Sequence, residues 1–178
     1  MMDRPERNEY VPFSMRIKAF LWDYVFILAY LLVVFGFSFF AQPLLLPLFR
    51  ESPFSAEMTG FFLITLPVSL YFAINEGVYL HATWGKRKMG ILVRDKRGLP
   101  VGLGRSLFRT ALKFAPWELA HFTIWHMILP STYSEEFISF LLITDYGLIS
   151  IYLISPFYNK KKRTLYDCLA GTAVGYKE

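Results

Sequence analysis

AFLWDYVFILAYLLVVFGFSFF, residues 19–40, decides the class of this protein. A helix needs about 20 mainly apolar residues to cross the hydrocarbon core of a bilayer. This stretch has that length, and Asp23 is its only charged residue. It is too long for the core of a cleavable signal peptide, and no small-residue cleavage motif follows it. The stretch therefore predicts a membrane-spanning helix that stays in the mature chain.

The composition of the whole chain also indicates a membrane protein. Of 178 residues, 54% are hydrophobic and 19% are charged, whereas soluble domains carry about 25% charged residues. The length suits a single domain, which we expect to cover residues 1–178. One cysteine, Cys168, excludes an internal disulfide. The net charge of +5 suits an anionic membrane better than a nucleic acid, because the apolar residues come in blocks and no nucleic-acid motif occurs.

Four membrane spans are predicted, at about residues 19–40, 61–80, 107–129 and 137–156. The first, second and fourth are strongly apolar, whereas the third also contains five charged or histidine side chains. A helix lying flat on the membrane surface is the alternative for the third stretch. Residues 41–60 hold three prolines and predict a loop, and Pro67 predicts a kink in the second span.

The distribution of Lys and Arg decides between these alternatives. Four precede the first span, one lies in 41–60, seven in 81–106, none in 130–136 and five in 157–178. Cytoplasmic loops carry the Lys/Arg excess, so the alternation favours a third crossing with both termini in the cytoplasm. The prediction is an all-α protein, a four-helix transmembrane bundle in the cell (inner) membrane. The basic run near residue 160 predicts contact with the bilayer and with anionic lipids at the cytoplasmic face.

Two short stretches outside the spans predict extended structure. Residues 91–93 are apolar and precede a turn-forming KRG, and residues 172–176 follow the last polar segment. We expect these cytoplasmic segments to pair with each other.

Several short motifs from residue 13 to residue 174 resemble the RDD family of bacterial multi-pass membrane proteins. The arginine and the first aspartate of the family match Arg16 and Asp23 in RIKAFLWD, and the second aspartate matches Asp167 in TLYDCLAGTAV. Between them, GKRKMG, ILVRD and GRSLFR resemble the intervening family elements, with Lys86 and Arg109 at motif positions.

Two positions depart from the family pattern. Trp84 precedes the GK where a smaller or hydroxyl residue is more usual, and Tyr166 stands where histidine is frequent before the second aspartate. The resemblance implies a multi-pass membrane fold. It also implies transport as one candidate activity, since transport, including cation/proton exchange, has been proposed for some members.

Charged side chains within a bilayer cost about 2.5–3.5 kcal/mol each on insertion scales, so they indicate function or pairing. One set is predicted near the inner ends of the spans. It comprises Arg16, Asp23, Glu76, Lys86, Arg109, Lys113 and Asp167. Two interpretations stay open: a structural network that ties the middle loop and the tail to the helix ends, or a gate or a site for an ion or lipid headgroup.

A second set is predicted deeper in the membrane, at Glu118, His121 and Asp145. The third and fourth spans run in opposite directions, so Glu118 and Asp145 reach similar depth. Carboxylates and histidines there can relay protons, and an interhelical hydrogen bond or ion pair is the alternative. No metal site is expected, because His121 and His126 lie five residues apart on different helix faces.

The sequence contains no P-loop, GxSxG, HExxH or kinase signature, so we expect neither enzymatic activity nor a cofactor. One hypothesis is a transporter or transporter subunit for an ion or small solute, which as a four-span protein favours a homo-oligomer. The other is a non-transporting membrane partner that stabilises or regulates another membrane complex.

Overall fold

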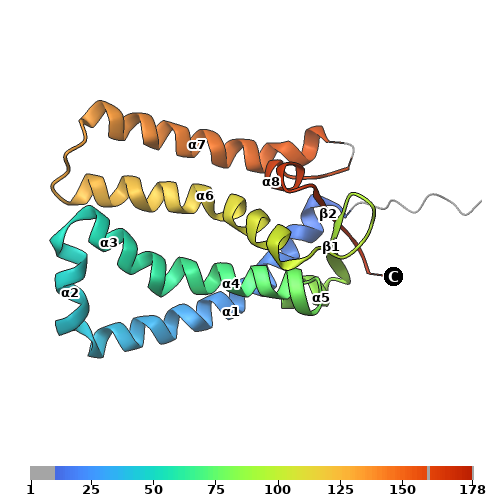
Figure 1. Cartoon of the computed structure of the whole chain (residues 1–178), viewed down its shortest axis with the longest axis horizontal. Helices are drawn as coiled ribbons and strands as arrows, with labels where there is room; N and C mark the ends of the chain where they lie inside the picture. The colour runs from blue at the N-terminus through green and yellow to red at the C-terminus, as the bar shows by residue number, and fades with distance from the viewer. Residues whose placement is uncertain (1–10, 160, 178) are drawn as a thin grey trace, which may run out of the picture.

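The computed structural model describes residues 11–159 and 161–177, and most of them are helical (Figure 1). Arg4, Arg7 and Lys160, which contribute to the charge distribution above, lie outside this part of the chain. The elements in chain order are α1 (Phe13–Phe40), α2 (Gln42–Glu51), α3 (Pro53–Gly60), the π-helical turn η1 (Phe61–Thr65), α4 (Leu66–Ile74), the π-helical turn η2 (Asn75–Tyr79), α5 (Trp84–Lys88), β1 (Ile91–Asp95), α6 (Leu103–Ile128), α7 (Glu135–Tyr158), α8 (Leu165–Leu169) and β2 (Thr172–Tyr176).

Three helices are long and apolar enough to cross a membrane: Phe13–Phe40, Pro53–Val78 and Glu135–Tyr158. They contain most of the first, second and fourth predicted spans. The third predicted span coincides with α6, a helix of 26 residues that carries more charge than the other three. The loop predicted for residues 41–60 is wrong, because α2 and α3 occupy it. Pro43 and Pro53 lie in the first turns of these helices, where a missing N–H costs no hydrogen bond.

The long helices run side by side in a row (Figure 1). α6 lies between α7 and the continuous α3–α4 segment, and α1 lies at the other edge of the row. α1 packs mainly on α5, at the end of the molecule that also holds β1, β2 and α8. We call this the sheet end, and we call the opposite end, with α2, the α2 end.

The predicted pairing of the two extended segments is confirmed. β1 and β2 are antiparallel, with Ile91 opposite Tyr176 and Asp95 opposite Thr172. Buried and partly buried residues alternate along β1. Ile91, one of the buried residues, packs with Val11, Ala19 and Val174 in a small apolar core under α1. The predicted KRG turn follows β1, where the Asp95 carboxylate accepts backbone N–H groups from Arg97 and Leu99 and Gly98 has a φ of 80°.

Three prolines inside the long helices each leave a backbone carbonyl without its helical donor, because proline has no N–H. A side-chain hydroxyl supplies the missing hydrogen bond in all three cases. The carbonyl four residues before Pro67 belongs to Leu63, and Tyr30 of α1 donates to it at 2.6 Å. The carbonyl four residues before Pro116 belongs to Leu112, and Tyr152 of α7 donates to it at 2.7 Å.

The third case lies within α7 itself. Ser155 donates to the carbonyl of Tyr152, four residues before Pro156, at 3.3 Å. In lipid, no water can donate a hydrogen bond to these carbonyls in place of the hydroxyls. Each of the three prolines therefore requires its hydroxyl donor. The tyrosine bonds also fasten α1 to the α3–α4 helix and α7 to α6.

We expect Tyr152→Phe to lower the free energy of unfolding by about 1 kcal/mol, because the Leu112 carbonyl loses its donor. In a Pro116→Ala background the same change should cost clearly less, because the alanine N–H restores the helical hydrogen bond. Thermal unfolding of the four proteins in detergent measures this coupling. Tyr158→Phe is the matched control, since Tyr158 is exposed at the end of α7. An equal cost of Tyr152→Phe in both backgrounds would contradict the proposed link.

Candidate functional site

The sheet end holds a buried group of charged side chains from five segments of the chain. Its first member is Asp23, which is 1% exposed on α1. Its carboxylate accepts hydrogen bonds from the Tyr71 hydroxyl at 2.9 Å, the Thr83 hydroxyl at 2.6 Å and the Gly85 backbone N–H at 2.7 Å. Three neutral donors thus hold this carboxylate, and no ion pair joins it to a cation of residues 11–159 or 161–177.

Gly85, the glycine of the GK motif, lies in close contact with the backbone of α1. A Cβ at Gly85 would overlap the Ala19 carbonyl oxygen and come within 2.9 Å of the Asp23 backbone nitrogen. Only glycine therefore allows the first turn of α5 to approach α1 closely enough for its N–H to reach Asp23. The same approach places Lys86 in the buried interior.

Arg109 of α6 connects the remaining members of the group. Its Nη1 pairs with Glu76 in η2, and its Nε donates to Asp167 of α8 at 2.8 Å. Lys86 pairs with the other oxygen of Glu76, and Arg16 of α1 pairs with the other oxygen of Asp167. The result is a continuous chain of alternating charge, which we call the charge network: Arg16, Asp167, Arg109, Glu76 and Lys86.

Asp167 joins this network to the C-terminal segment. It closes a capping box with Thr164 at the start of α8, and its side chain also accepts from Thr172 at 3.3 Å. Arg16 in turn donates to the carbonyl of Lys162 at 2.8 Å. Burial alone would raise the pKa of the Asp167 carboxyl, but Arg16 and Arg109 outweigh burial and lower it below its ordinary value.

Lys86 responds differently to its surroundings. Burial lowers the pKa of its ammonium group, and the adjacent Glu76 carboxylate offsets that effect only in part. Buried ion pairs give little net stability against an apolar replacement, but removing one partner is costly because the other charge stays buried. The network is thus an arrangement in which each member requires the others.

Of the two positions that depart from the family pattern, Tyr166 packs on this group and Trp84 packs beside it. Tyr166 lies against the Arg109 guanidinium, 5.2 Å from Cζ to ring centroid. Trp84 packs edge-on against Trp22 and Phe26, and Lys88 lies over the rings of Trp22 and Trp84. Both aromatic residues therefore cover the outside of the polar group.

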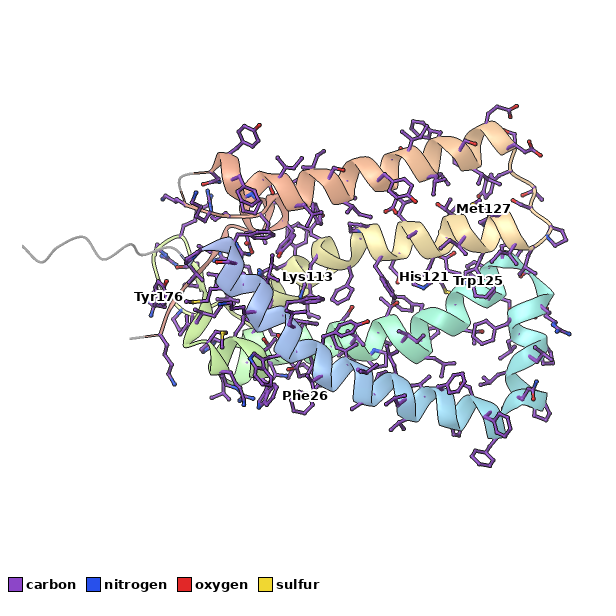
Figure 2. All side chains as sticks on the ribbon, turned by 180° about the vertical axis from the view of Figure 1, so that it is seen from behind. Phe26, Lys113, His121, Trp125, Met127 and Tyr176 are labelled. Atoms are coloured by element: carbon purple, nitrogen blue, oxygen red, sulfur yellow. The ribbon has the colours of Figure 1, made fainter. Side chains whose placement is uncertain are left out.

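Lys113 stands apart from the network that the sequence grouped it with. Its Nζ lies 3.2 Å from the centroid of the Phe72 ring, with Phe20 and Phe114 further around it. Within residues 11–159 and 161–177, the ammonium has no hydrogen-bond or ion-pair partner. Figure 2 shows Lys113 where α1 comes close to α6.

The deeper set is not brought together as one site. Glu118 and His121 lie on the side of α6 toward α3, and Figure 2 shows His121 and Trp125 in the space between these helices. There they are the electrostatic neighbours of Glu57 in α3. Asp145 is 4% exposed in α7, and no hydrogen bond or ion pair joins it to Glu118 or His121 in the described chain. One buried oxygen of Glu118 and one of Asp145 have no hydrogen-bond partner there.

Several residues of these sites were missed by the sequence analysis. Tyr71 and Thr83 hold Asp23, and Glu57 accompanies Glu118. Thr83 could have been found, because a threonine one residue before the WGKRK segment is a typical helix N-cap and its side chain does accept from the Lys86 N–H. Tyr71 and Glu57 carry no such local signal.

We expect Arg109→Met to destabilise the protein by about 3–5 kcal/mol, because Glu76 and Asp167 each lose a buried partner. Arg109→Lys should recover only part of that loss, since one ammonium cannot span both carboxylates in the way a guanidinium does. Arg97→Gln is the control, because Arg97 is largely exposed beside Asp95 and its removal should cost about 0–1 kcal/mol. Thermal unfolding in detergent is the measurement, and similar losses for Arg97→Gln and Arg109→Met would argue against the bridging role.

One of three comparisons with known proteins found a match. No curated protein and no solved structure matches the chain. The family model described as RDD family matches residues 10–171, a range that includes all five members of the charge network as well as Asp23 and Lys113. The chain belongs to the RDD family of membrane proteins.

Proposed function

We propose that this protein crosses the membrane four times and acts as a transporter, or transporter subunit, for an ion or small solute. The observation that carries the proposal is a contrast between two kinds of buried carboxylate. Asp167 and Glu76 are fully paired at the sheet end, whereas Asp145 lies within α7 with no partner in the described chain. An embedded carboxylate that stabilises no contact is the kind of group that binds and releases a proton or cation.

The crossing of α6 is supported by the direction of its side chains. α6 lies along both α7 and the α3–α4 segment, each of which is long and apolar enough to span. Its Arg109 and Glu118 face the protein, whereas its large exposed side chains are apolar from residue 107 onward: Leu107, Phe108, Trp117, Ile124, Met127 and Ile128. A helix with that pattern fits between spans and has an apolar surface for lipid.

Charge supports a cytoplasmic sheet end. The described parts of the two basic segments, residues 81–106, 157–159 and 161–177, lie at this end, which by the positive-inside rule is cytoplasmic. The α2 end carries Arg50 together with Glu51, Glu135 and Glu136. We infer the inner membrane, with both termini on the cytoplasmic side. The proposal requires no catalytic activity, cofactor or metal.

A non-transporting role as a membrane partner is the second candidate. Only 6% of the apolar window of α1 and of α7 is buried within the chain, compared with 22% for the Pro53–Val78 helix. The two edge helices therefore offer long apolar faces, which a second copy or another membrane protein could cover in place of lipid.

We expect a reporter domain fused after Glu136 to indicate the outer side of the membrane, because α6 must cross to bring residues 130–136 there. A reporter fused after Lys88 is the matched control and should indicate the cytoplasm. A cytoplasmic signal from both fusions would place α6 on the membrane surface and contradict the four-span proposal.

We expect proteoliposomes that contain only this protein to show cation-dependent proton flux, measured with an internal pH dye under imposed Na⁺ or K⁺ gradients. Asp145→Asn should reduce that flux by about tenfold or more, because the titratable group is lost. Its thermal stability should not fall, since no partner is broken. Glu51→Gln, at an exposed carboxylate, should leave the flux unchanged. Absence of flux together with co-purification of one stable partner would favour the second candidate.

A further inference from the structure

The buried charged side chains at the sheet end include one more cation than carboxylates. Four cations gather there, Arg16, Lys86, Arg109 and Lys113, against the three carboxylates Asp23, Glu76 and Asp167. Arg16, Lys86 and Arg109 pair directly with Glu76 and Asp167. Lys113 is the cation of this group that has no hydrogen-bond or ion-pair partner within residues 11–159 and 161–177. A charge withdrawn from water without a partner is costly, so the site as built by this chain alone is incomplete at Lys113.

The Lys113 ammonium is surrounded by phenylalanine rings and not by hydrogen-bond acceptors. Phe72, Phe20 and Phe114 lie around Nζ at 3.2, 5.7 and 5.5 Å from their centroids. Such cation–π contacts attract the ammonium but accept none of its three N–H groups in hydrogen bonds as oxygen does. The nearest carboxylates that act on it, Glu76 and Asp23, are already occupied by other donors.

We propose that Lys113 binds the phosphate of an anionic phospholipid of the adjacent leaflet, and that this phosphate supplies the oxygen acceptor that the Lys113 ammonium lacks. Lys113 is only partly buried, and Phe20 of α1, one of the rings around its ammonium, is 43% exposed. This exposed ring gives the lipid an apolar contact beside the ammonium. The ammonium and the phosphate would form a charge-assisted hydrogen bond.

The depth of Lys113 favours a lipid headgroup over an ion from solution. Its ammonium lies beside Phe20, which is two residues before Trp22 on α1. Trp22 and Trp84 share contact with Lys88, and Trp together with Lys is typical of the membrane–water boundary. Lys113 is therefore near the level where lipid phosphates lie, and the exposed Phe20 ring beside it is on the surface from which a lipid would reach it. The inference needs only that the chain is in a membrane and is independent of transport.

Phosphatidylglycerol titrated into delipidated protein in detergent tests the inference, with native mass spectrometry for binding and thermal unfolding for stability. Lys113→Gln should weaken binding by about tenfold or more, as expected for one charge-assisted hydrogen bond. Lys113→Arg should retain it. Lys88→Gln, at an exposed lysine of the same end, should change binding by about fivefold or less.

Further measurements test whether the phosphate comes from a lipid or from solution, and whether the Lys113 variants are correctly folded. Diacylglycerol should not stabilise the wild type, and 10 mM inorganic phosphate should not replace the lipid. Without lipid, Lys113→Met should be at least as stable as the wild type, because it removes an unpaired charge from an aromatic surround. Undiminished phosphatidylglycerol binding by Lys113→Gln and Lys113→Met would overturn the proposal. Stabilisation by inorganic phosphate equal to that by the lipid would overturn the lipid as its source.

Discussion

The Arg109 guanidinium, held between the carboxylates of Glu76 and Asp167, is the contact on which the sheet end depends. It joins a helix from the middle of the chain to the second apolar helix and to the C-terminal segment, and Lys86 and Arg16 extend it to α5 and α1. Where helices lie in lipid, apolar packing contributes little to their association, because lipid is as apolar as the side chains it would replace. Polar contacts and close backbone approach therefore determine how these helices meet, and Gly85 against Ala19 shows the second kind.

Much of this arrangement could be predicted from residue types and their spacing. The three apolar spans follow from length and hydropathy, and the turn signal after Val93 indicates a strand that ends there. The pairing of this strand with β2 was expected only because both are short extended segments outside the spans. The charge network at one end of the molecule follows from the place of its members at span ends and from the family motifs. These members are Arg16, Glu76, Lys86, Arg109 and Asp167. Charged residues near the same membrane face have few alternatives to pairing with one another.

The failures have physical causes as well. Residues 41–60 form two helices because Pro43 and Pro53 start them, and composition alone does not distinguish a proline that starts a helix from one that breaks it. Glu118 and Asp145 were expected to meet because rise per residue gives depth, but depth says nothing of rotation about the helix axis. Glu118 faces α3, on a helix that Pro116 interrupts two residues earlier. In the sequence, Tyr30 and Tyr152 cannot be distinguished from other aromatic residues of the apolar helices. Their role depends on the carbonyls of Leu63 and Leu112, which lie on other helices and lack a donor because of a proline four residues later.

The place of Asp167 in the network also constrains how the chain is assembled during synthesis. α8 follows all the long helices, so the ribosome delivers Asp167 only after α1 and α6 have been synthesised. Until then Arg16 has no carboxylate partner and Arg109 has only Glu76. The C-terminal segment with α8 thus completes the charge network after the long helices have been made. A chain interrupted before α8 would present unsatisfied arginines to the membrane proteases that survey nascent proteins.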